Sequence, residues 1–423
     1  MSRAGSTPVT PDPSGVVGEV AAAPLDPTTE ILRVEDLTVR FPTDDGMVNA
    51  VRGVSYVLHP REVLGIVGES GSGKSVSSMA VMGLLPRTAR IDGRILFRGD
   101  DVLKMRADQQ RSLRGRKIGM IFQDAMTSLN PVLTIGAQLA EAVRSHEHIS
   151  HTAALVRARE MLDLVGIPQA KDRLRSYPHE FSGGMRQRAM IAMAVINRPD
   201  VIFADEPTTA LDVTVQAQIL DTLMEVKDEV DAAIVFITHD LGVIASVADR
   251  VLVMYAGKPV ETAGIDEIFT EPRMPYTAGL LGSMPTVDLI GERLRPIQGT
   301  PPSLINLPTG CPFRPRCPIA VHECATTEPP LYETDRRDHR AACHRWDDVA
   351  AYDDATAMFR VAPGETVGLA AEETDDLVLP GIRPEELDAT TTPGTTTPGT
   401  TTPGTTTSGP GTRSGSTAAG EHA

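Results

Sequence analysis

The chain has 423 residues, 41% of them hydrophobic, which is enough for two or three domains with a large buried core. Its net charge of −16 at pH 7 argues against a broad nucleic-acid-binding surface, so we expect no nucleic-acid partner. No run approaches the ~18 unbroken apolar residues of a membrane-spanning helix, and the N-terminus lacks the pattern of a secretory signal. These features predict a cytosolic protein.

The hydrophobic pattern predicts an ordered α/β region between two disordered ends. Residues 1–29 are rich in Pro, Ala, Thr and Ser without periodicity and predict a disordered leader. Apolar and polar side chains alternate in residues 31–41 and 51–58, which predicts half-exposed antiparallel strands. Further along, buried strands and helical patterns alternate, as an α/β fold requires. The predicted buried strands are residues 63–67, 118–122, 201–204, 233–238 and 250–255, and the helical stretches are residues 76–85, 135–174 and 213–226.

Residues 68–75 read Gly-Glu-Ser-Gly-Ser-Gly-Lys-Ser and fit the phosphate-binding pattern G-x-x-x-x-G-K-[ST] between a strand and a helix. Glycines let the backbone curl around phosphates with its N–H groups pointing inward, and the next helix adds its dipole. Lys74 supplies a positive charge for the outer phosphates, and Ser75 supplies a hydroxyl ligand for Mg²⁺. The loop itself is predicted to bind through Gly68, Ser70, Gly71 and Gly73. The bland alternative is a Gly/Ser-rich turn that happens to end in Lys-Ser.

Two carboxylates follow the apolar strand at residues 201–204. Asp205 is expected at the carboxyl end of that strand, where open α/β sheets bind ligands. We interpret Asp205 as a Mg²⁺ ligand through the ion's water shell, and Glu206 as the base that activates the attacking water. An acidic strand-to-turn boundary is the structural alternative.

Residues 177–188 read Tyr-Pro-His-Glu-Phe-Ser-Gly-Gly-Met-Arg-Gln-Arg. Ser182 can cap the helix that follows, while Gly183 and Gly184 let the backbone approach a phosphate. The stretch resembles the signature motif of ATP-binding cassette (ABC) ATPases, usually written LSGGQ, with Phe181 in place of Leu and Met185 in place of Gln. The resemblance implies an ABC cassette: a RecA-like phosphate-loop core, an antiparallel β subdomain and a helical subdomain. It also implies that the signature of one subunit closes on ATP held by its partner.

The same resemblance implies roles for four more residues. Gln123 matches the Q-loop, which contacts Mg²⁺ and the attacking water and passes closure to membrane subunits. Asp212 matches the D-loop at the dimer interface, and His239 matches the switch histidine near the γ-phosphate. Phe41 matches the aromatic residue that stacks on adenine. A lone Gln, His or Phe is usually structural, and it is the order and spacing of these residues that favours the functional interpretation.

Beyond residue 285 the chain turns Pro-rich and irregular. We predict a cassette at residues 30–285 and a small C-terminal module at residues 286–350 that holds all four cysteines, Cys311, Cys317, Cys324 and Cys343. In a reducing cytosol such clustering favours a metal or iron–sulfur site over disulfides. Residues 351–423 turn acidic and then repeat TTTPG, which predicts a disordered tail. A glycosylated stalk is the alternative for that repeat.

Within the ABC class, the chain resembles the ATPase subunits of oligopeptide and dipeptide importers. The resemblance rests on residues 121–131, 177–188, 205–218 and 310–318, and departs from the common form at Ala125. It implies that the four cysteines can bind a [4Fe–4S] cluster. The spacing C-x5-C-x6-C-x18-C leaves zinc and buried free thiols open.

The resemblance therefore predicts an ATP-hydrolysing subunit that works peripherally on the cytoplasmic side of the cell membrane. Its implied partners are a second ATPase subunit, either another copy or a related chain, two transmembrane permease subunits and an extracytoplasmic peptide-binding protein. Import of nickel or another small solute is an alternative within the family. Two other classes stay open: a soluble ABC ATPase that acts on DNA or ribosomes, and a metal- or redox-sensing protein whose ATP site is regulatory.

Overall fold

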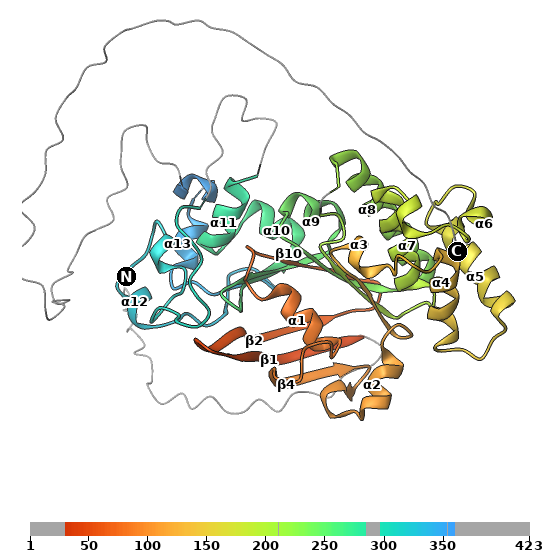
Figure 1. Cartoon of the computed structure of the whole chain (residues 1–423). Coiled ribbons are helices and arrows are strands. Elements are labelled where there is room, and N and C mark those ends of the chain that lie inside the picture. Colours follow the sequence, from red (N-terminus) through yellow and green to blue (C-terminus); the bar gives the residue numbers. More distant parts are fainter. Residues whose placement is uncertain (1–29, 210, 285–296, 353, 360–423) are drawn as a thin grey trace, which may run out of the picture. The chain divides into compact units, whose positions relative to one another are not determined.

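The computed structural model describes residues 30–209, 211–284, 297–352 and 354–359 (Figure 1). The predicted leader at residues 1–29 lies outside the described residues. So does the predicted tail, except for residues 351, 352 and 354–359.

The first sheet is antiparallel, as the alternating pattern predicts. Its strands are β1 (Leu32–Thr43), β2 (Gly46–Leu58), β4 (Arg90–Phe97) and β5 (Asp100–Asp101), in the order β2-β1-β4-β5. The apolar residues of β1, such as Leu32, Val34 and Val39, are buried while their neighbours are partly exposed. The pairing of β1 with β2 is irregular between Val34 and Leu37, where Asp36 has a positive φ of 45°. This bulge keeps Leu37 on the buried face beyond the irregularity.

The second sheet contains a parallel core. Its order is β11-β12-β10-β9-β3-β8-β7-β6, and β9, β3, β8, β7 and β6 pair in parallel. These five strands are β9 (Arg250–Tyr255), β3 (Val63–Val67), β8 (Ala233–Thr238), β7 (Val201–Asp205) and β6 (Ile118–Ile121). Apart from half-buried Arg250 in β9, they are buried throughout, because both faces of the sheet are covered. Strand β10 (Lys258–Gly264) returns antiparallel to β9.

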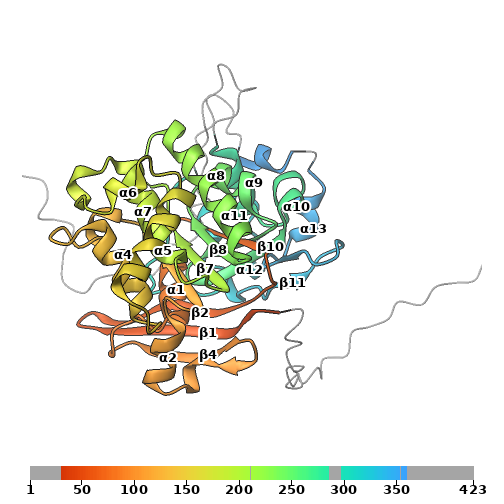
Figure 2. The same cartoon turned by 90° about the vertical axis from the view of Figure 1, so that its right-hand side faces the viewer.

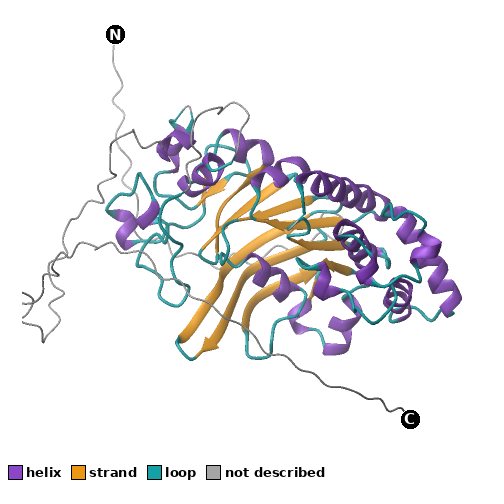
Figure 3. Ribbon diagram, turned by 45° about the horizontal axis from the view of Figure 1, so that its top comes forward, coloured by secondary structure: helices purple, strands orange, loops and turns teal. Residues whose placement is uncertain are grey.

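Two hydrophobic cores cover the two faces of the parallel strands. Leu64 and Ile66 of β3 pack into the first core, with the antiparallel sheet and α1 (Lys74–Val81). Val63 and Val67 pack into the second core, with most of the other helices. Figure 3 shows helices along the outside of the strands. The alternation of side chains along each strand thus divides one apolar run between two cores.

Four consecutive helices pack on the second core. Helices α4 (Ile135–Arg144), α5 (His151–Leu164), α6 (Ala170–Arg173) and α7 (Gly183–Val195) lie together at the end of the main sheet away from α12 and α13 (Figures 1 and 2). Further helices are α2 (Ala107–Leu113), α3 (Ala125–Ser128), α8 (Val213–Val230), α9 (Leu241–Val247), α10 (Ile265–Thr270) and α11 (Pro275–Gly282). In the described part of the chain, no helix has both the length and the apolar character needed to cross a membrane.

The C-terminal segment extends the main sheet. It contains η3 (Arg314–Arg316), α12 (Glu323–Thr326), β11 (Tyr332–Glu333), β12 (Arg340–Ala341), α13 (Trp346–Ala350) and η4 (Ala355–Phe359). Strand β12 pairs with β10, so that Ala341 stands opposite Glu261. Phe313 and Cys343 belong to the second core, and η4 packs on α11 through Phe359. The segment predicted as a separate module therefore shares the sheet and the core of the cassette.

A buried contact between a histidine and a glutamate side chain joins this segment to β10. His339 Nε2 lies 2.8 Å from Glu261 Oε1, and both side chains are 0% exposed. The backbone N–H of Arg273 donates to the same carboxylate oxygen. A buried carboxylate needs such partners, because its solvation by water has been lost.

We expect His339→Ala to lower the free energy of unfolding by about 3 kcal/mol, because it leaves the Glu261 carboxylate buried with one partner fewer. Urea unfolding of the full-length chain measures this loss. Arg337→Ala is the matched control, since the Arg337 side chain is 95% exposed and its replacement should change stability by no more than ~0.5 kcal/mol. Equal effects of the two substitutions would contradict the expectation.

Candidate nucleotide-binding site

The loop between β3 and α1 is pressed against two other strands. Gly73 has a φ of 98°, and a Cβ at this position would lie 2.3 Å from the carbonyl oxygen of Ala50 in β2. Gly68 has a φ of 153°, and its Cβ would lie 2.2 Å from the carbonyl oxygen of Met254 in β9. Only glycine meets both the positive φ and the close approach. The glycines of the predicted phosphate loop are therefore required by the fold as well as by its chemistry.

Lys74 begins α1 and turns its side chain back over this loop. Its Nζ donates to the carbonyl oxygens of Gly68, at 2.6 Å, and Glu69, at 3.0 Å. The side chain is buried, and burial lowers the pKa of Lys74, although the carboxylates of Glu206 and Asp205 oppose the shift. A buried ammonium without a direct carboxylate contact attracts an anion, because the anion restores the charge balance lost on desolvation.

Ser75 at the start of α1 and Asp205 at the end of β7 bring two oxygen ligands together. Ser75 Oγ donates to Asp205 Oδ1 at 2.9 Å. Burial raises the pKa of Asp205, although the hydrogen bond from Ser75 opposes it. A buried carboxylate beside a hydroxyl is the donor set that Mg²⁺ uses together with phosphate oxygens. The two residues fit the predicted Mg²⁺ site.

The Glu206 carboxylate contacts three side chains from different loops. Its Oε2 accepts hydrogen bonds from Gln123 Nε2, at 3.0 Å, and Thr209 Oγ1, at 2.9 Å, while His239 Nδ1 lies 3.1 Å from Oε1. Burial favours the neutral acid, but the contacts with His239 and Thr209 outweigh burial and lower the pKa of Glu206. The carboxylate is therefore ionised at neutral pH and able to accept a proton.

The backbone at Glu206 is strained. Its φ is 47°, in the left-handed region, and its N–H donates to the carbonyl oxygen of Ile237 in β8 at 2.8 Å. A non-glycine residue in this region costs about 1–2 kcal/mol. The turn carries the Glu206 carboxylate out of β7 towards Gln123 and His239, which explains why the surrounding fold holds the strained conformation.

The residues of the predicted signature lie on a different part of the chain. Ser182 caps α7, and its Oγ accepts from the N–H of Met185 at 3.3 Å. Asp212 caps α8, and a Cβ on Gly184 would lie 2.9 Å from Val215 Cγ1, so the starts of α7 and α8 are in close contact. Among the described residues, no hydrogen bond joins Ser182, Gly183, Gly184 or Asp212 to the phosphate loop. Within one chain, the two groups of predicted residues are separate.

Phe41 lies in β1 opposite Val48 of β2, where it is half-buried and packs against the first core. Its predicted stacking on adenine stays a prediction.

Sequence reasoning missed Thr209, which lies three residues after Glu206 and donates a hydrogen bond to its carboxylate. A Thr in a strand-to-helix turn carries no signal of its own. Only the tertiary position of its hydroxyl identifies it.

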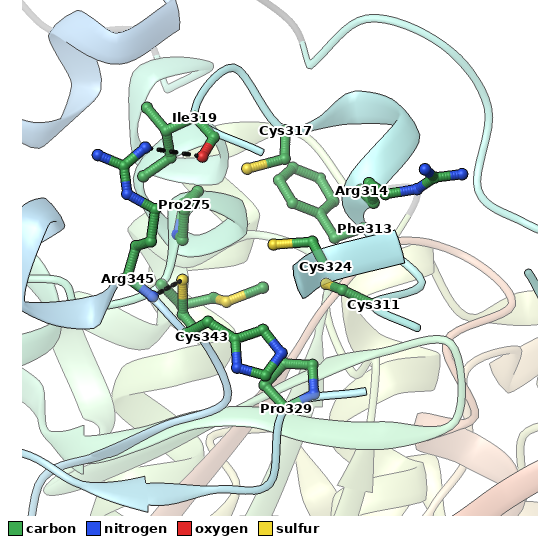
Figure 4. Close-up of a pocket in the computed structure, with 12 residues that line it drawn as sticks. Pro275, Cys311, Phe313, Arg314, Cys317, Ile319, Cys324, Pro329, Cys343 and Arg345 are labelled. Atoms are coloured by element: carbon green, nitrogen blue, oxygen red, sulfur yellow. Dashed lines mark hydrogen bonds between the residues drawn. The ribbon is translucent and has the colours of Figure 1, made fainter. Parts of the chain in front are cut away.

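The predicted [4Fe–4S] cluster is wrong. Across the described residues, all four cysteines included, no group of three or more His, Cys, Asp or Glu side chains is arranged to hold a metal ion. The cysteines line a cavity of about 10 Å³, the room of one water molecule, which Phe313 and Pro275 also line (Figure 4).

Burial also shifts the proton equilibria of the thiols. Burial raises the pKa of Cys317 and of Cys343 to about 12, and burial also raises that of Cys311. In the absence of a metal ion, these three thiols stay protonated at neutral pH. Among the four thiols, Cys324 and Cys343 are buried, and Cys311 and Cys317 are half-buried.

Comparison with known proteins places this site in a family. A family model described as ABC transporter matches residues 51–209, and one described as Oligopeptide/dipeptide transporter, C-terminal region, matches residues 260–324. The dipeptide transport ATP-binding protein DppD of Bacillus subtilis is 54% identical over 302 residues, which are 71% of this chain and 90% of DppD. The chain belongs to the family of oligopeptide and dipeptide transport ATP-binding proteins.

Other members and a solved structure agree. The oligopeptide transport ATP-binding protein OppD of Mycobacterium bovis is 54% identical over 317 residues, which are 74% of this chain and 52% of OppD. The chain thus matches about half the length of that relative. A dimeric structure of the ATP-binding cassette MJ0796 in a post-hydrolysis state, bound to ADP and Pi, is 25% identical with a TM-score of 0.50, covering 55% of this chain and 98% of MJ0796. The predicted ABC cassette fold is confirmed.

The two neighbouring carboxylates should affect stability in opposite directions. The folded chain favours protonated Asp205, so the ionised form costs stability once the pH rises through its raised pKa. Asp205→Asn should therefore raise the free energy of unfolding of the nucleotide-free chain at pH 7.5, and the gain should shrink as the pH falls towards the ordinary value of 3.8.

Glu206 contributes stability above its ordinary pKa of 4.5, and that stability is lost as the pH falls through its lowered pKa. Glu206→Gln should therefore lower the free energy of unfolding at pH 7.5. Urea unfolding of both variants at pH 7.5 and 5.5 makes the comparison. A change of the same sign in both variants at pH 7.5 would refute this account of the site.

Proposed function

We propose that this chain hydrolyses ATP as the nucleotide-binding subunit of an ABC importer for oligopeptides or dipeptides. The observation that carries the proposal is the set of contacts around Glu206, where a strained turn, Gln123 and His239 meet next to the Asp205–Ser75 pair. The family and the names of its members supply the substrate class. We assign substrate selection to other subunits, because the site consists of a phosphate loop and the side chains around two carboxylates.

The residues of the phosphate loop bind and orient the nucleotide. The positive φ values of Gly68, Gly71 and Gly73 turn the loop backbone so that its N–H groups can face a phosphate chain. Ser70 lies exposed at the tip of this loop. Lys74 exchanges its bonds to the loop carbonyls for the outer phosphates. Ser75, Asp205 and Gln123 would hold Mg²⁺, which would supply positive charge to the phosphate oxygens when bound.

Glu206 accepts the proton of the attacking water. Its lowered pKa keeps it ionised before the reaction, and its burial favours the protonated form that results. Gln123 and Thr209 fix one carboxylate oxygen, and His239 fixes the other. The exposed ring of His239 is available to the terminal phosphate from its other nitrogen, Nε2.

The signature residues act on a second subunit. Ser182, Gly183 and Gly184 begin α7 with exposed or half-exposed backbone, and α7 is long enough to present a helix dipole to an anion. Asp212 begins α8 beside them. We infer that they complete the nucleotide site of a second ATPase subunit, either a copy of this chain or a related one. The dimeric state of MJ0796 supports this inference.

Exposed apolar residues near Gln123 support a permease partner. Phe122 is 38%, Val132 76% and Leu133 36% exposed, although they are large apolar side chains in a described segment of the cassette. These three exposed side chains lie within residues 122–133, and we interpret them as part of an interaction surface. We assign them to two transmembrane permease subunits that hold the chain at the cytoplasmic side of the membrane. An extracytoplasmic peptide-binding protein completes the importer.

Glu206→Gln should leave ATP binding within about threefold of wild type and reduce turnover by at least about 100-fold, which is the contribution of a general base. Equilibrium binding of ATP and steady-state phosphate release measure the two effects. Glu225→Gln, an exposed glutamate on α8, is the matched control and should keep full turnover. Undiminished turnover in Glu206→Gln would refute the role of this residue.

Val132→Asp should reduce recovery of two hydrophobic membrane proteins with the tagged full-length chain by about tenfold, because it buries a charge in the docking surface. ATP binding should not change. Val156→Asp on α5, where the valine is 47% exposed, is the matched control. Recovery of nucleic acid, or of neither permease with the wild-type chain, would contradict the importer assignment.

A further inference from the structure

An arginine of the C-terminal segment reaches into the phosphate loop. Arg316 Nη1 donates to Glu69 Oε2 at 2.7 Å, and Nη2 donates to Glu69 Oε1 at 2.8 Å. This is a bidentate pair, the strongest geometry for an arginine and a carboxylate. The Arg316 side chain is 4% exposed and that of Glu69 is 25% exposed. Water therefore screens this pair less than it screens an exposed ion pair.

The guanidinium is fixed from several sides. Its Nε donates to the carbonyl oxygen of Gln298 at 3.0 Å, and Nη2 also donates to that of Ile297 at 3.3 Å. Its central carbon lies 5.9 Å from the ring centroids of both Tyr255 and Phe313. Burial opposes its charge, but the hydrogen bonds to Glu69 and Tyr255 outweigh it and raise the pKa of Arg316. The contacts with Gln298, Ile297 and the two rings hold the guanidinium in addition to its pair with Glu69.

Glu69 is held at its backbone as well. Its N–H donates to Tyr276 Oη at 2.8 Å, and its carbonyl oxygen accepts from Lys74 Nζ at 3.0 Å. Tyr276 packs against Tyr255 and Phe313, with ring centroids 4.6 and 5.4 Å away. Glu69, the residue that follows Gly68 in the loop, is thus fixed through both its side chain and its peptide groups. The aromatic cluster that fixes it also carries Arg316.

The charge of Glu69 makes this contact important for binding. A carboxylate within a loop that receives a triphosphate repels the ligand unless a cation neutralises it. Lys74 bonds only to carbonyl oxygens of the loop, and the cation paired with Glu69 in the described part of the chain is Arg316. We infer that Arg316 is a positioning residue for the phosphate loop, which neutralises Glu69 and holds it in the shape that binds ATP. This inference rests on the proposed function.

Substitution of Arg316 tests the inference on the full-length chain. Arg316→Gln should raise the Kd and the KM for Mg·ATP about tenfold and change kcat by less than about twofold, because ground-state and transition-state binding weaken together. Arg314→Gln removes an exposed arginine from the same η3 turn and should change neither constant. An Arg316→Gln variant whose Kd stays within twofold of wild type would overturn the inference.

A second substitution separates charge neutralisation from simple loss of folding. Adding Glu69→Gln to Arg316→Gln removes the unpaired carboxylate, so it should restore the Kd to within about threefold of wild type. A purely structural role of Arg316 predicts no such rescue, and failure to rescue would overturn the inference. If Arg316→Gln alone does not fold, as judged by circular dichroism, Arg316→Lys replaces it and should show a smaller increase in Kd that Glu69→Gln again reverses.

The outcomes distinguish this inference from the proposed function. A wild-type chain that binds no Mg·ATP contradicts the proposed function. A wild-type chain that binds Mg·ATP while Arg316→Gln binds equally well overturns only the role of Arg316.

Discussion

The parallel pairing of three strands determines the chemistry of this protein. Strand β3 pairs with β8 so that Val67 stands opposite Thr238, and β8 pairs with β7 so that Ile237 stands opposite Asp205. The three strands therefore end at the same edge of the sheet, where the phosphate loop, the two carboxylates and His239 follow them. A shift of register by one residue in either pair would separate these groups.

In the structure, the polar groups of the site bind one another. Lys74 bonds to the loop carbonyls, Ser75 bonds to Asp205, and Glu206 accepts from Gln123 and Thr209. For Lys74 and Asp205, which are buried, these bonds satisfy polar groups that would otherwise cost stability. Under the proposed function, they are also the groups that a nucleotide with its metal ion would use, so binding would exchange one set of partners for another. The pKa of Asp205 is raised by burial, whereas that of Glu206 is lowered by its contacts, so two adjacent carboxylates lie in different electrostatic surroundings.

Local patterns predicted much of this arrangement. Unbroken apolar runs mark the buried strands, and the glycine spacing marks the loop at residues 68–75, because both depend on residues close in sequence. Contacts between distant residues could not be predicted. Arg316 and Glu69 are 247 residues apart, and a lone arginine in a Pro-rich stretch indicates no partner. The cysteine spacing misled for the same reason, since it fixes the order of the thiols but not the arrangement of their sulfur atoms.

Because β12 pairs with β10, the cassette cannot be separated from the C-terminal segment without exposing a strand edge. Ala341 and Arg340 cover the edge of β10, and the N–H of Ala342 donates to the carbonyl oxygen of Val260. A fragment cut after residue 284 would leave that edge open, and an open strand edge recruits other chains. Fragments and chimeras divided at that point would therefore be prone to aggregate. The useful boundary for engineering this protein lies beyond α13.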